Sequence, residues 1–488
     1  MLIKNAGVKE VKILKDKNNI VLKYGTKSAI ITAVVLAVII VLNVFAGSLN
    51  IKFDATKEKL YTLSEQSKNI ISSLDTDVNM YALYEKGSED PVIKEIFENY
   101  ENLSSHIHTE FVDPYENPQI AMMYSTTTEN LSIGTVIVES GEKYRIITQS
   151  DMAEYGVDEA TNMMYMKSFN VETCITSAVL YVSGAEMNKI YMLKGHSEQD
   201  FGSSLLTKLQ NDNYEIESLY LDSEESVPED ADIVVINSPM TDITEGELQK
   251  LSTYLSNDGR AFINVGIGTE TMTNMSVLLS NYGIEANNAM TIEGSQDYVY
   301  GNNPYYIMPH VEQHDITKNM VSDEEEVFFP YAQGFEEVEN KKDTLTIEPL
   351  LTTSGQSYGK KELDSIENFQ KTDNDISGPF NLAVAVTDKF TTDTEHTTKI
   401  VALGGSSITD SNIDSYVNGG NYDFILNSIN WLIDKDQSTS VPSKNIEGNS
   451  YLNIGATASI IIMFISVVLI PFVIAAYGII NMAKRKSK

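Results

Sequence analysis

The sequence predicts a mixed α/β domain held between two transmembrane helices. Three observations predict this: a long uncharged apolar run near each end, strands that alternate with amphipathic helices between the runs, and a single cysteine among 488 residues. Apolar strands that alternate with helices are typical of an α/β sheet covered on both faces. Because one cysteine cannot form an intrachain disulfide, the domain must be stabilised by its hydrophobic core.

The two apolar runs cover residues 29–46 and 454–480, and neither contains a charged side chain. A helix of about 18 residues is about 27 Å long, close to the hydrocarbon thickness of a bilayer. A soluble helix of that length would show a polar face, and these runs show none. The first run is also longer than a signal-peptide core and lacks an A-x-A cleavage pattern. We therefore expect uncleaved transmembrane helices at residues 28–47 and 453–480.

Basic residues flank both runs. Residues 1–27 carry seven lysines against Glu10 and Asp16, and residues 481–488 carry four basic side chains and no acid. Because positive charge stays in the cytoplasm, we expect a cell-membrane protein with both termini inside and its large domain outside. Between the flanks, 24 basic residues face 67 acidic ones, a formal charge of about −43. Such a field disfavours nucleic acid as a partner.

Residues 48–150 predict a membrane-proximal module. Thr62 and Glu65 form the pattern of a capping box that would start its first helix. The predicted elements are helices 64–74, 91–103 and 118–124, strands 78–84 and 107–112, and a hairpin of strands 134–139 and 144–148. This order is thioredoxin-like. No Cys-x-x-Cys follows the first strand, so the module lacks the thiols that disulfide exchange needs.

A connecting region at residues 151–188 follows. It predicts a helix over residues 168–183, with Cys174 on the apolar stripe of that helix. Cysteine is among the most frequently buried residue types, so we expect a structural thiol rather than a reactive one.

Residues 189–435 predict a second module on a parallel sheet with helices on both faces. The predicted elements are strands 190–193, 216–221, 233–236, 261–265, 381–386 and 399–403, and helices 203–211, 244–255, 274–281 and 422–433. Thr244 and Glu247 form a second capping-box pattern. Residues 283–380 read as a long, partly irregular insertion, and residues 436–452 as a polar linker.

Several catalytic patterns are incomplete in this sequence. The glycines of residues 355–361 are spaced wrongly for an ATP-binding loop. The second module resembles the amidotransferase-like and flavodoxin-like α/β folds, but Ile267 stands where a class I glutamine amidotransferase carries its nucleophile. A calcium loop starting at Asp410 lacks the glycine and the glutamate it needs. His310 and His314 predict a surface pair. We therefore expect no catalytic residues, no cofactor and no metal.

One turn stands out as a candidate site. Gly195, His196, Ser197 and Glu198 directly follow strand 190–193. Open α/β sheets bind ligands at the carboxyl ends of their parallel strands, which makes this turn a candidate ligand or partner site. A capping or turn-forming role for His196 is the favoured interpretation.

Five stretches carry a family resemblance: residues 53–64, 111–114, 195–198, 238–259 and 427–432. In this order they resemble the patterns of the GldG-like family, the auxiliary membrane subunits of ABC transporters associated with gliding motility and related export systems. Asp258 departs from the family, which has glycine there. The resemblance implies an ABC ATPase subunit and a membrane permease subunit as partners, and no catalytic residues. Two predicted spans cannot enclose a substrate path, so the permease would be a separate chain.

The leading hypothesis from the sequence is an accessory subunit of an ABC transport system whose extracytoplasmic domain binds a substrate or a partner protein. The alternative is a stand-alone membrane-anchored ectodomain for adhesion or cell-envelope interaction. A third reading is a degenerate hydrolase or amidotransferase, which turnover dependent on His196 or Glu198 would revive.

Overall fold

The structure is a computed structural model. It describes residues 62–124, 131–158, 163–267, 272–322, 324–361, 370–391 and 394–435, with Val34, Ala37, Val441, Lys444 and Asn445. Within these described residues, no helix is both long and apolar enough to cross a membrane. The predicted spans at 28–47 and 453–480 and the two basic flanks lie outside the described residues, except for Val34 and Ala37, which are helical.

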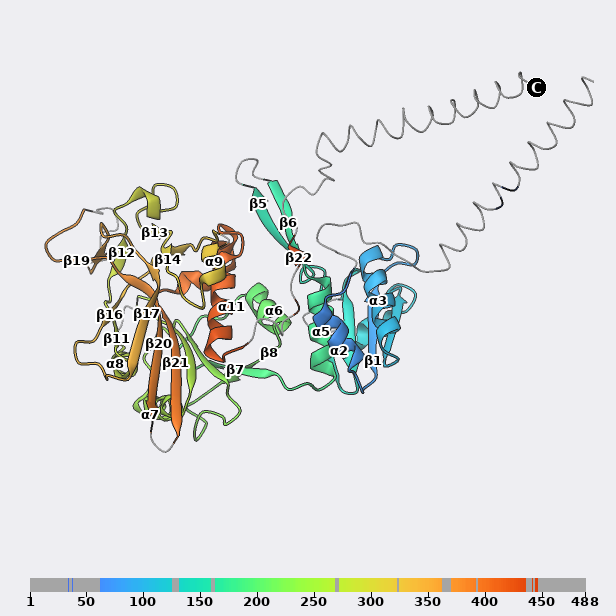
Figure 1. Ribbon diagram of the computed structural model, residues 1–488, viewed down its shortest axis with the longest axis horizontal. Coiled ribbons are helices and arrows are strands. Elements are labelled where there is room, and N and C mark those ends of the chain that lie inside the picture. The colour runs from blue at the N-terminus through green and yellow to red at the C-terminus, as the bar shows by residue number, and fades with distance from the viewer. Residues whose placement is uncertain are drawn as a thin grey trace, which may run out of the picture. The chain divides into compact units, whose positions relative to one another are not determined.

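The first group of elements builds a four-stranded sheet. Its members are α2 Glu65–Ser72, β1 Val78–Leu83, α3 Pro91–Leu103, β2 Ile107–Val112, α4 Pro118–Tyr124, β3 Val136–Ser140, β4 Lys143–Ile147 and α5 Val171–Val182 (Figure 1). The strand order is β2–β1–β3–β4, with β1 parallel to β2 and antiparallel to β3. Side chains of α2, α3 and α5 bury one face of the sheet, and α4 packs on the other. The predicted order of strands and helices is confirmed.

The first helix begins at a different cap from the predicted one. Ser64 is the N-cap, and its hydroxyl accepts from the amide of Ser67 at 3.2 Å. The amide of Ser64 donates to Oε1 of Glu172 at 2.6 Å, so a side chain distant in the sequence takes the place of the local glutamate. The prediction of a capping box at Thr62 and Glu65 is therefore wrong.

An antiparallel hairpin of β5 Ala153–Asp158 and β6 Met163–Phe169 precedes α5. The sequence predicted a helix from residue 168, but residues 168 and 169 belong to the strand and α5 starts at Val171. The short strand β22 Lys444–Asn445 pairs with β6, within a range predicted to be only a linker. Pairing between segments so far apart in the sequence leaves no local pattern that could predict it.

The second sheet is built from β7 Asn188–Leu193, α6 Ser203–Asn211, β8 Tyr214–Leu219, β9 Ile233–Asn237, α7 Glu245–Ser256, β10 Arg260–Asn264, α8 Thr273–Asn281, β20 Asn381–Thr391, β21 Glu395–Leu403 and α11 Gly420–Leu432. Strands β8, β7, β9, β10 and β21 are adjacent and parallel, but β20 is antiparallel to β21. The connection between β20 and β21 is too short for a crossover, which forces a hairpin. The prediction of a parallel sheet is right for its centre and wrong for this side.

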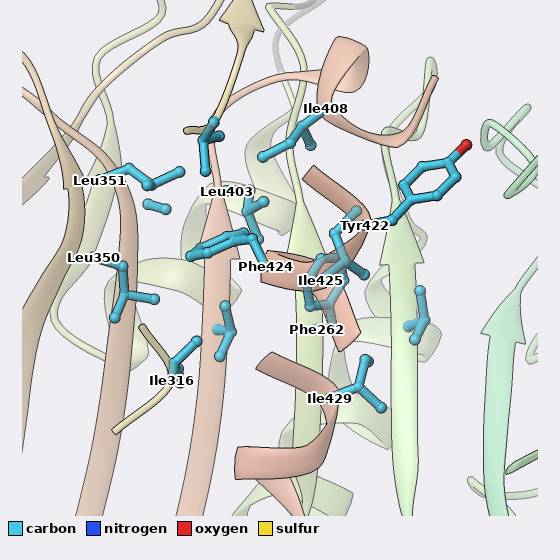
Figure 2. Packing of buried hydrophobic residues seen from close by; sticks show 14 of the residues in the cluster. Phe262, Ile316, Leu350, Leu351, Leu403, Ile408, Tyr422, Phe424, Ile425 and Ile429 are labelled. Atoms are coloured by element: carbon cyan, nitrogen blue, oxygen red, sulfur yellow. The ribbon is translucent and has the colours of Figure 1, made fainter. Parts of the chain in front are cut away.

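Hydrophobic side chains cover both faces of the second sheet. Ile190 and Val235 face α6 and α11, whereas their neighbours Tyr191 and Val234 face α7 and α8. Figure 2 shows the first of these cores, in which Phe262 of β10 lies near residues of α11. Because successive strand residues point to opposite faces, uniformly apolar strands require cover on both sides. The predicted mixed α/β class is confirmed.

The region predicted as an insertion contains more regular structure than expected. Its elements are β11 Ile284–Ala286, β12 Met290–Ile292, η1 Gln296–Tyr298, β13 Tyr306–Ile307, β14 His310–Val311, α9 Lys318–Ser322, β15 Phe329–Pro330, β16 Phe335–Glu337, β17 Leu345–Thr352, β18 Tyr358–Lys360 and β19 Ile376–Ser377. Strands β16 and β17 pair antiparallel with β20 and extend the main sheet. After β21 come η2 Ser406–Thr409 and α10 Ser411–Ser415.

Candidate functional site

The candidate site lies where the chain reverses its direction of travel across the second sheet. Strand β7 lies between β8 and β9. After β7 the chain enters α6 on one face, and after β9 it enters α7 on the opposite face. The connections that leave the carboxyl ends of β7 and β9 therefore diverge. Open α/β sheets bind ligands at such a point.

The turn after β7 is held in an unusual backbone conformation. Gly195 has φ +123° and Ser197 has φ +57°, both in the region that most side chains avoid. The carbonyl of His196 accepts from the amides of Met240 at 2.9 Å and Thr241 at 3.2 Å. The loop after β9 thus fixes the turn after β7, and the His196 side chain has a defined direction.

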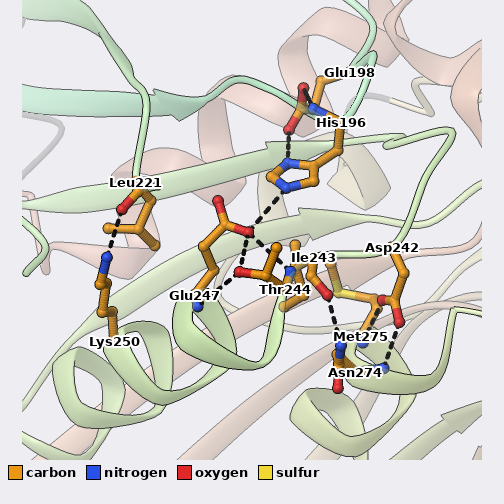
Figure 3. Close-up of polar contacts among 10 residues, drawn as sticks. All are labelled: His196, Glu198, Leu221, Asp242, Ile243, Thr244, Glu247, Lys250, Asn274 and Met275. Carbon is orange, nitrogen blue, oxygen red and sulfur yellow. Dashed lines mark hydrogen bonds and ion pairs between the residues drawn. The ribbon is translucent and has the colours of Figure 1, made fainter. Parts of the chain in front are cut away.

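The ring of His196 is held between two carboxylates (Figure 3). Its Nδ1 lies 2.8 Å from Oε1 of Glu198, and its Nε2 lies 3.0 Å from Oε2 of Glu247. The side chain of His196 is 8% exposed and those of both glutamates are 2% exposed. Because both ring nitrogens are engaged, the imidazole offers no free lone pair for general-base chemistry.

Glu247 also caps the helix that carries it. Its Oε2 accepts from the amide and the hydroxyl of Thr244, each at 2.8 Å, and the Thr244 hydroxyl accepts from the amide of Glu247 at 3.2 Å. The predicted capping box at the start of α7 is confirmed. The same carboxylate binds His196, so a helix cap and the candidate turn form one hydrogen-bonded unit, a contact that the sequence analysis missed.

The charges of the cluster reinforce one another. The hydrogen bond to Glu198 raises the pKa of His196 above its ordinary value of 6.5, against the effect of burial, and Glu247 adds to the rise. Burial alone would raise the pKa of Glu198, but hydrogen bonds from His196 and from backbone amides lower it. Burial would also raise the pKa of Glu247, but the hydrogen bonds from Thr244 and the charge of His196 lower that pKa. These directions favour the protonated form of the His196 ring and the ionised forms of the two carboxylates.

The cluster borders a pocket of about 520 Å³. The pocket is lined by residues from the turn, from the segment after β8 and from the start of α7: Lys194, Gly195, His196, Tyr220, Asp222, Ser223, Thr244 and Glu247. Of the predicted turn, Gly195 and His196 line it, whereas Ser197 is exposed and Glu198 supports the histidine ring. The volume is that of a small-molecule site.

Other residues singled out from the sequence lie elsewhere. Cys174 is buried, accepts from Asn211 and donates to the carbonyl of Asp151, and its predicted structural role agrees with this burial. His314 is not on the surface: its side chain is 7% exposed and packs against Trp431, 5.4 Å between ring centroids. His310 is 59% exposed on a strand. Within the described ranges, no group of three His, Cys, Asp or Glu residues could hold a metal ion.

Residues 187–428 match the model of a family described as "ABC-type uncharacterized transport system". The chain belongs to this ABC-transport auxiliary family. The match includes the whole of the His196 cluster and its pocket. Residues 57–150 match a separate domain family of unknown function.

Further comparisons add only distant likenesses. A search of curated proteins found no match. Among solved structures, the family member is similar to an mmIFT52 N-terminal domain, at 16% identity and a TM-score of 0.38, over 51% of this chain and 98% of that one. It is also similar to a putative ThuA-like protein from Bacteroides uniformis, at 14% identity and a TM-score of 0.33, over 52% and 94%. A domain of alkyl hydroperoxide reductase AhpF from Enterococcus faecalis follows, at 11% identity and a TM-score of 0.17, over 32% and 78%.

Proposed function

We propose that this chain is a non-catalytic accessory subunit of an ABC transport system, of the GldG-like type, whose extracytoplasmic domain binds a substrate or a partner. The observation that carries the proposal is the family match over residues 187–428, which contains a pocket at the carboxyl edge of the sheet. An ABC ATPase subunit and a membrane permease subunit would be its partners. Both termini would lie in the cytoplasm, with spans at residues 28–47 and 453–480.

The proposed domain organisation places two modules outside the membrane. The first, at residues 48–150, would be thioredoxin-like in connectivity but without redox chemistry. The second, at residues 189–435, would combine an amidotransferase-like or flavodoxin-like sheet with added strands. Residues 151–188 and 436–452 would connect these modules to each other and to the second span.

The pocket supports binding rather than catalysis. His196 is engaged at both nitrogens, and Ile267 offers no nucleophile. A rigid charged rim beside the exposed ring of Tyr220 suits recognition of a small polar molecule or of a partner's side chain. Gly195, His196, Ser197 and Glu198 are thus proposed as the binding turn.

Co-purification tests the transport role. The full chain, tagged and extracted in mild detergent, should recover an ABC ATPase and a protein with several membrane spans, identified by mass spectrometry. Recovery of the chain alone, in a detergent that preserves other transporter complexes from the same membranes, would favour a stand-alone ectodomain for cell-envelope interaction.

A matched pair of variants tests the pocket. Ser223 lines the pocket and Ser226 does not, and both are exposed. Ser223→Trp should fill the pocket and remove any small molecule that native mass spectrometry detects on the purified complex, whereas Ser226→Trp should retain it. If partners dissociate from the Ser223→Trp variant alone, the pocket binds a partner. Equal behaviour of the two variants in both measurements would contradict a binding role for the pocket.

A further inference from the structure

Several tyrosine rings form a surface from segments that do not line the His196 pocket. Residues 295–306 contain four tyrosines among twelve residues, together with serine, glycine and asparagine. This composition is characteristic of antibody binding loops, in which rigid tyrosines supply contact area at low entropic cost. We call this array the tyrosine surface; its members are the exposed Tyr300, Tyr331 and Tyr416 and the half-buried Tyr305 and Tyr306.

Buried Phe328 organises the tyrosine surface. Its ring centroid lies 5.3 Å from that of Tyr300, 5.6 Å from that of Tyr306 and 5.5 Å from that of Tyr416. Phe328 is 2% exposed. Rings that lean on one buried ring keep their orientation without a ligand, so a partner would bind without first ordering them.

The backbone also holds the rings in place. Strands β13 and β15 pair antiparallel, and the amide of Tyr331 donates to the carbonyl of Tyr305 at 3.0 Å. Tyr331 has φ +56°, a conformation that is rare for a bulky residue. Its ring stacks on that of Tyr305 at 5.1 Å between centroids and 18° between planes, yet remains 47% exposed. Strained backbone of this kind is concentrated at functional sites.

The surface is exposed as well as ordered. Tyr300 is 41% exposed and Tyr416 is 52% exposed. Apolar ring area on this scale is costly to leave in water, and tyrosine is enriched at protein interfaces because its ring is apolar and its hydroxyl is polar.

Local charge indicates the kind of partner. The three segments that carry these rings, 293–306, 324–335 and 404–420, contain no lysine or arginine and seven acidic residues, of which all but Glu293 and Asp414 are at least partly exposed. Lys167 approaches from β6, donates to the carbonyl of Asn418 and lies 3.8 Å from the carboxylate of Asp423. Asp423 also pairs with Lys208, which pairs with Glu154 in turn, so two carboxylates offset these two lysines. Tyrosine ring faces attract cations, the acidic character of these segments adds to the attraction, and guanidinium groups stack well on aromatic faces.

We propose that the tyrosine surface docks a basic, arginine-bearing segment of a partner protein. The surface lies in a different part of the chain from the proposed binding turn, so this inference does not depend on the transport role.

Binding of a synthetic nona-arginine peptide to the full chain in detergent tests the proposal. Replacing Tyr300, Tyr331 and Tyr416 together by alanine should weaken binding by at least about tenfold, because three stacking contacts are removed. Replacing the same three by phenylalanine should keep the affinity, since the ring faces remain. Tyr115→Ala, at another exposed tyrosine in the first module, should have no effect.

Three results would overturn the proposal. Equal binding by the triple alanine variant, with an unchanged circular dichroism spectrum, would mean that nona-arginine responds only to the overall negative charge. Equal affinity for nona-lysine would exclude stacking of guanidinium groups. Binding of a neutral hexasaccharide with the same dependence on the three rings, and no binding of nona-arginine, would mean that the surface recognises carbohydrate.

Discussion

Two buried ionic clusters each join segments that are distant in the sequence, and the two clusters differ in their surroundings. In the first region, Oε1 of Glu172 accepts from the amide of Ser64 at 2.6 Å, and Oε2 lies 2.7 Å from the ammonium of Lys444. Lys444 also donates to the carbonyl of Thr62 at 2.8 Å. In the second region, the ring of His196 lies between the carboxylates of Glu198 and Glu247. The Glu172 carboxylate is buried in the first cluster, whereas the second cluster borders a pocket.

The cluster around Glu172 joins the two ends of the described domain. Thr62 follows the segment after the first predicted span, and Lys444 precedes the second. The side chain of Glu172 is 3% exposed and that of Lys444 is 12% exposed. Burial alone would raise the pKa of Glu172, but the hydrogen bond from Lys444 and those from the serines lower it. Glu172 and Lys444 form a one-to-one pair, whereas His196 faces two carboxylates beside a pocket.

Glu172→Ala should have the largest effect on stability. It leaves Lys444 and the amide of Ser64 without their buried acceptor, which should lower the free energy of unfolding by about 3 kcal/mol. Urea unfolding of the full chain in detergent, followed by circular dichroism, measures this. Glu65→Ala is the control, because Glu65 forms only an exposed pair with Lys68. A loss at Glu172 no larger than at Glu65 would mean that the cluster does not join the ends.

His196→Ala should lower the free energy of unfolding by less than Glu172→Ala does, by about 2 kcal/mol, because water in the pocket can hydrate the two carboxylates left behind. Fluorescence of Trp431, the single tryptophan, reports unfolding of this module. His310→Ala, at an exposed histidine, should change little. A larger loss of stability for His196→Ala than for Glu172→Ala would mean that water in the pocket does not hydrate the two carboxylates.

The pH dependence sharpens the same contrast. The pKa of His196 is raised in the folded protein. Its contribution to the free energy of unfolding is therefore fully present below the ordinary pKa of 6.5 and is lost as pH rises through the higher folded pKa. The lowered pKa values of Glu198 and Glu247 give a contribution that is present above 4.5 and lost at lower pH. The stability difference between wild type and His196→Ala should therefore be largest between these limits. A difference that stays constant from about pH 5 to about pH 9 would exclude a protonated His196.

Thr244→Ala should have the smallest effect, about 1 kcal/mol, which is typical for loss of a helix cap. It also removes the hydroxyl that donates to the Glu247 carboxylate, while the backbone amide of residue 244 remains, so the carboxylate depends more on His196. A double-mutant cycle with His196→Ala should then show coupling between the two sites. Strictly additive losses would mean that the cap and the candidate turn act separately.

The sequence analysis found part of the His196 cluster for identifiable reasons. His196 and Glu198 lie together in the chain at the end of an apolar strand, and Thr244 with Glu247 has a recognisable spacing. Contact between these two pairs spans 51 positions and depends on β7 and β9 being neighbours. Glu172 was invisible because its partners lie 108 positions before it and in a strand of two residues near the other end.

The sequence by itself determined the mixed α/β class, most elements of both modules, the buried position of Cys174 and the turn at Gly195–Glu198. These properties follow from local periodicity, capping residues and apolar runs, which need only near neighbours. Tertiary structure alone decided the antiparallel half of the second sheet, the true N-cap at Ser64 and the assembly of the two ionic clusters. Each of these depends on which distant segments meet, and the energy of a buried charge is set by the partner that reaches it.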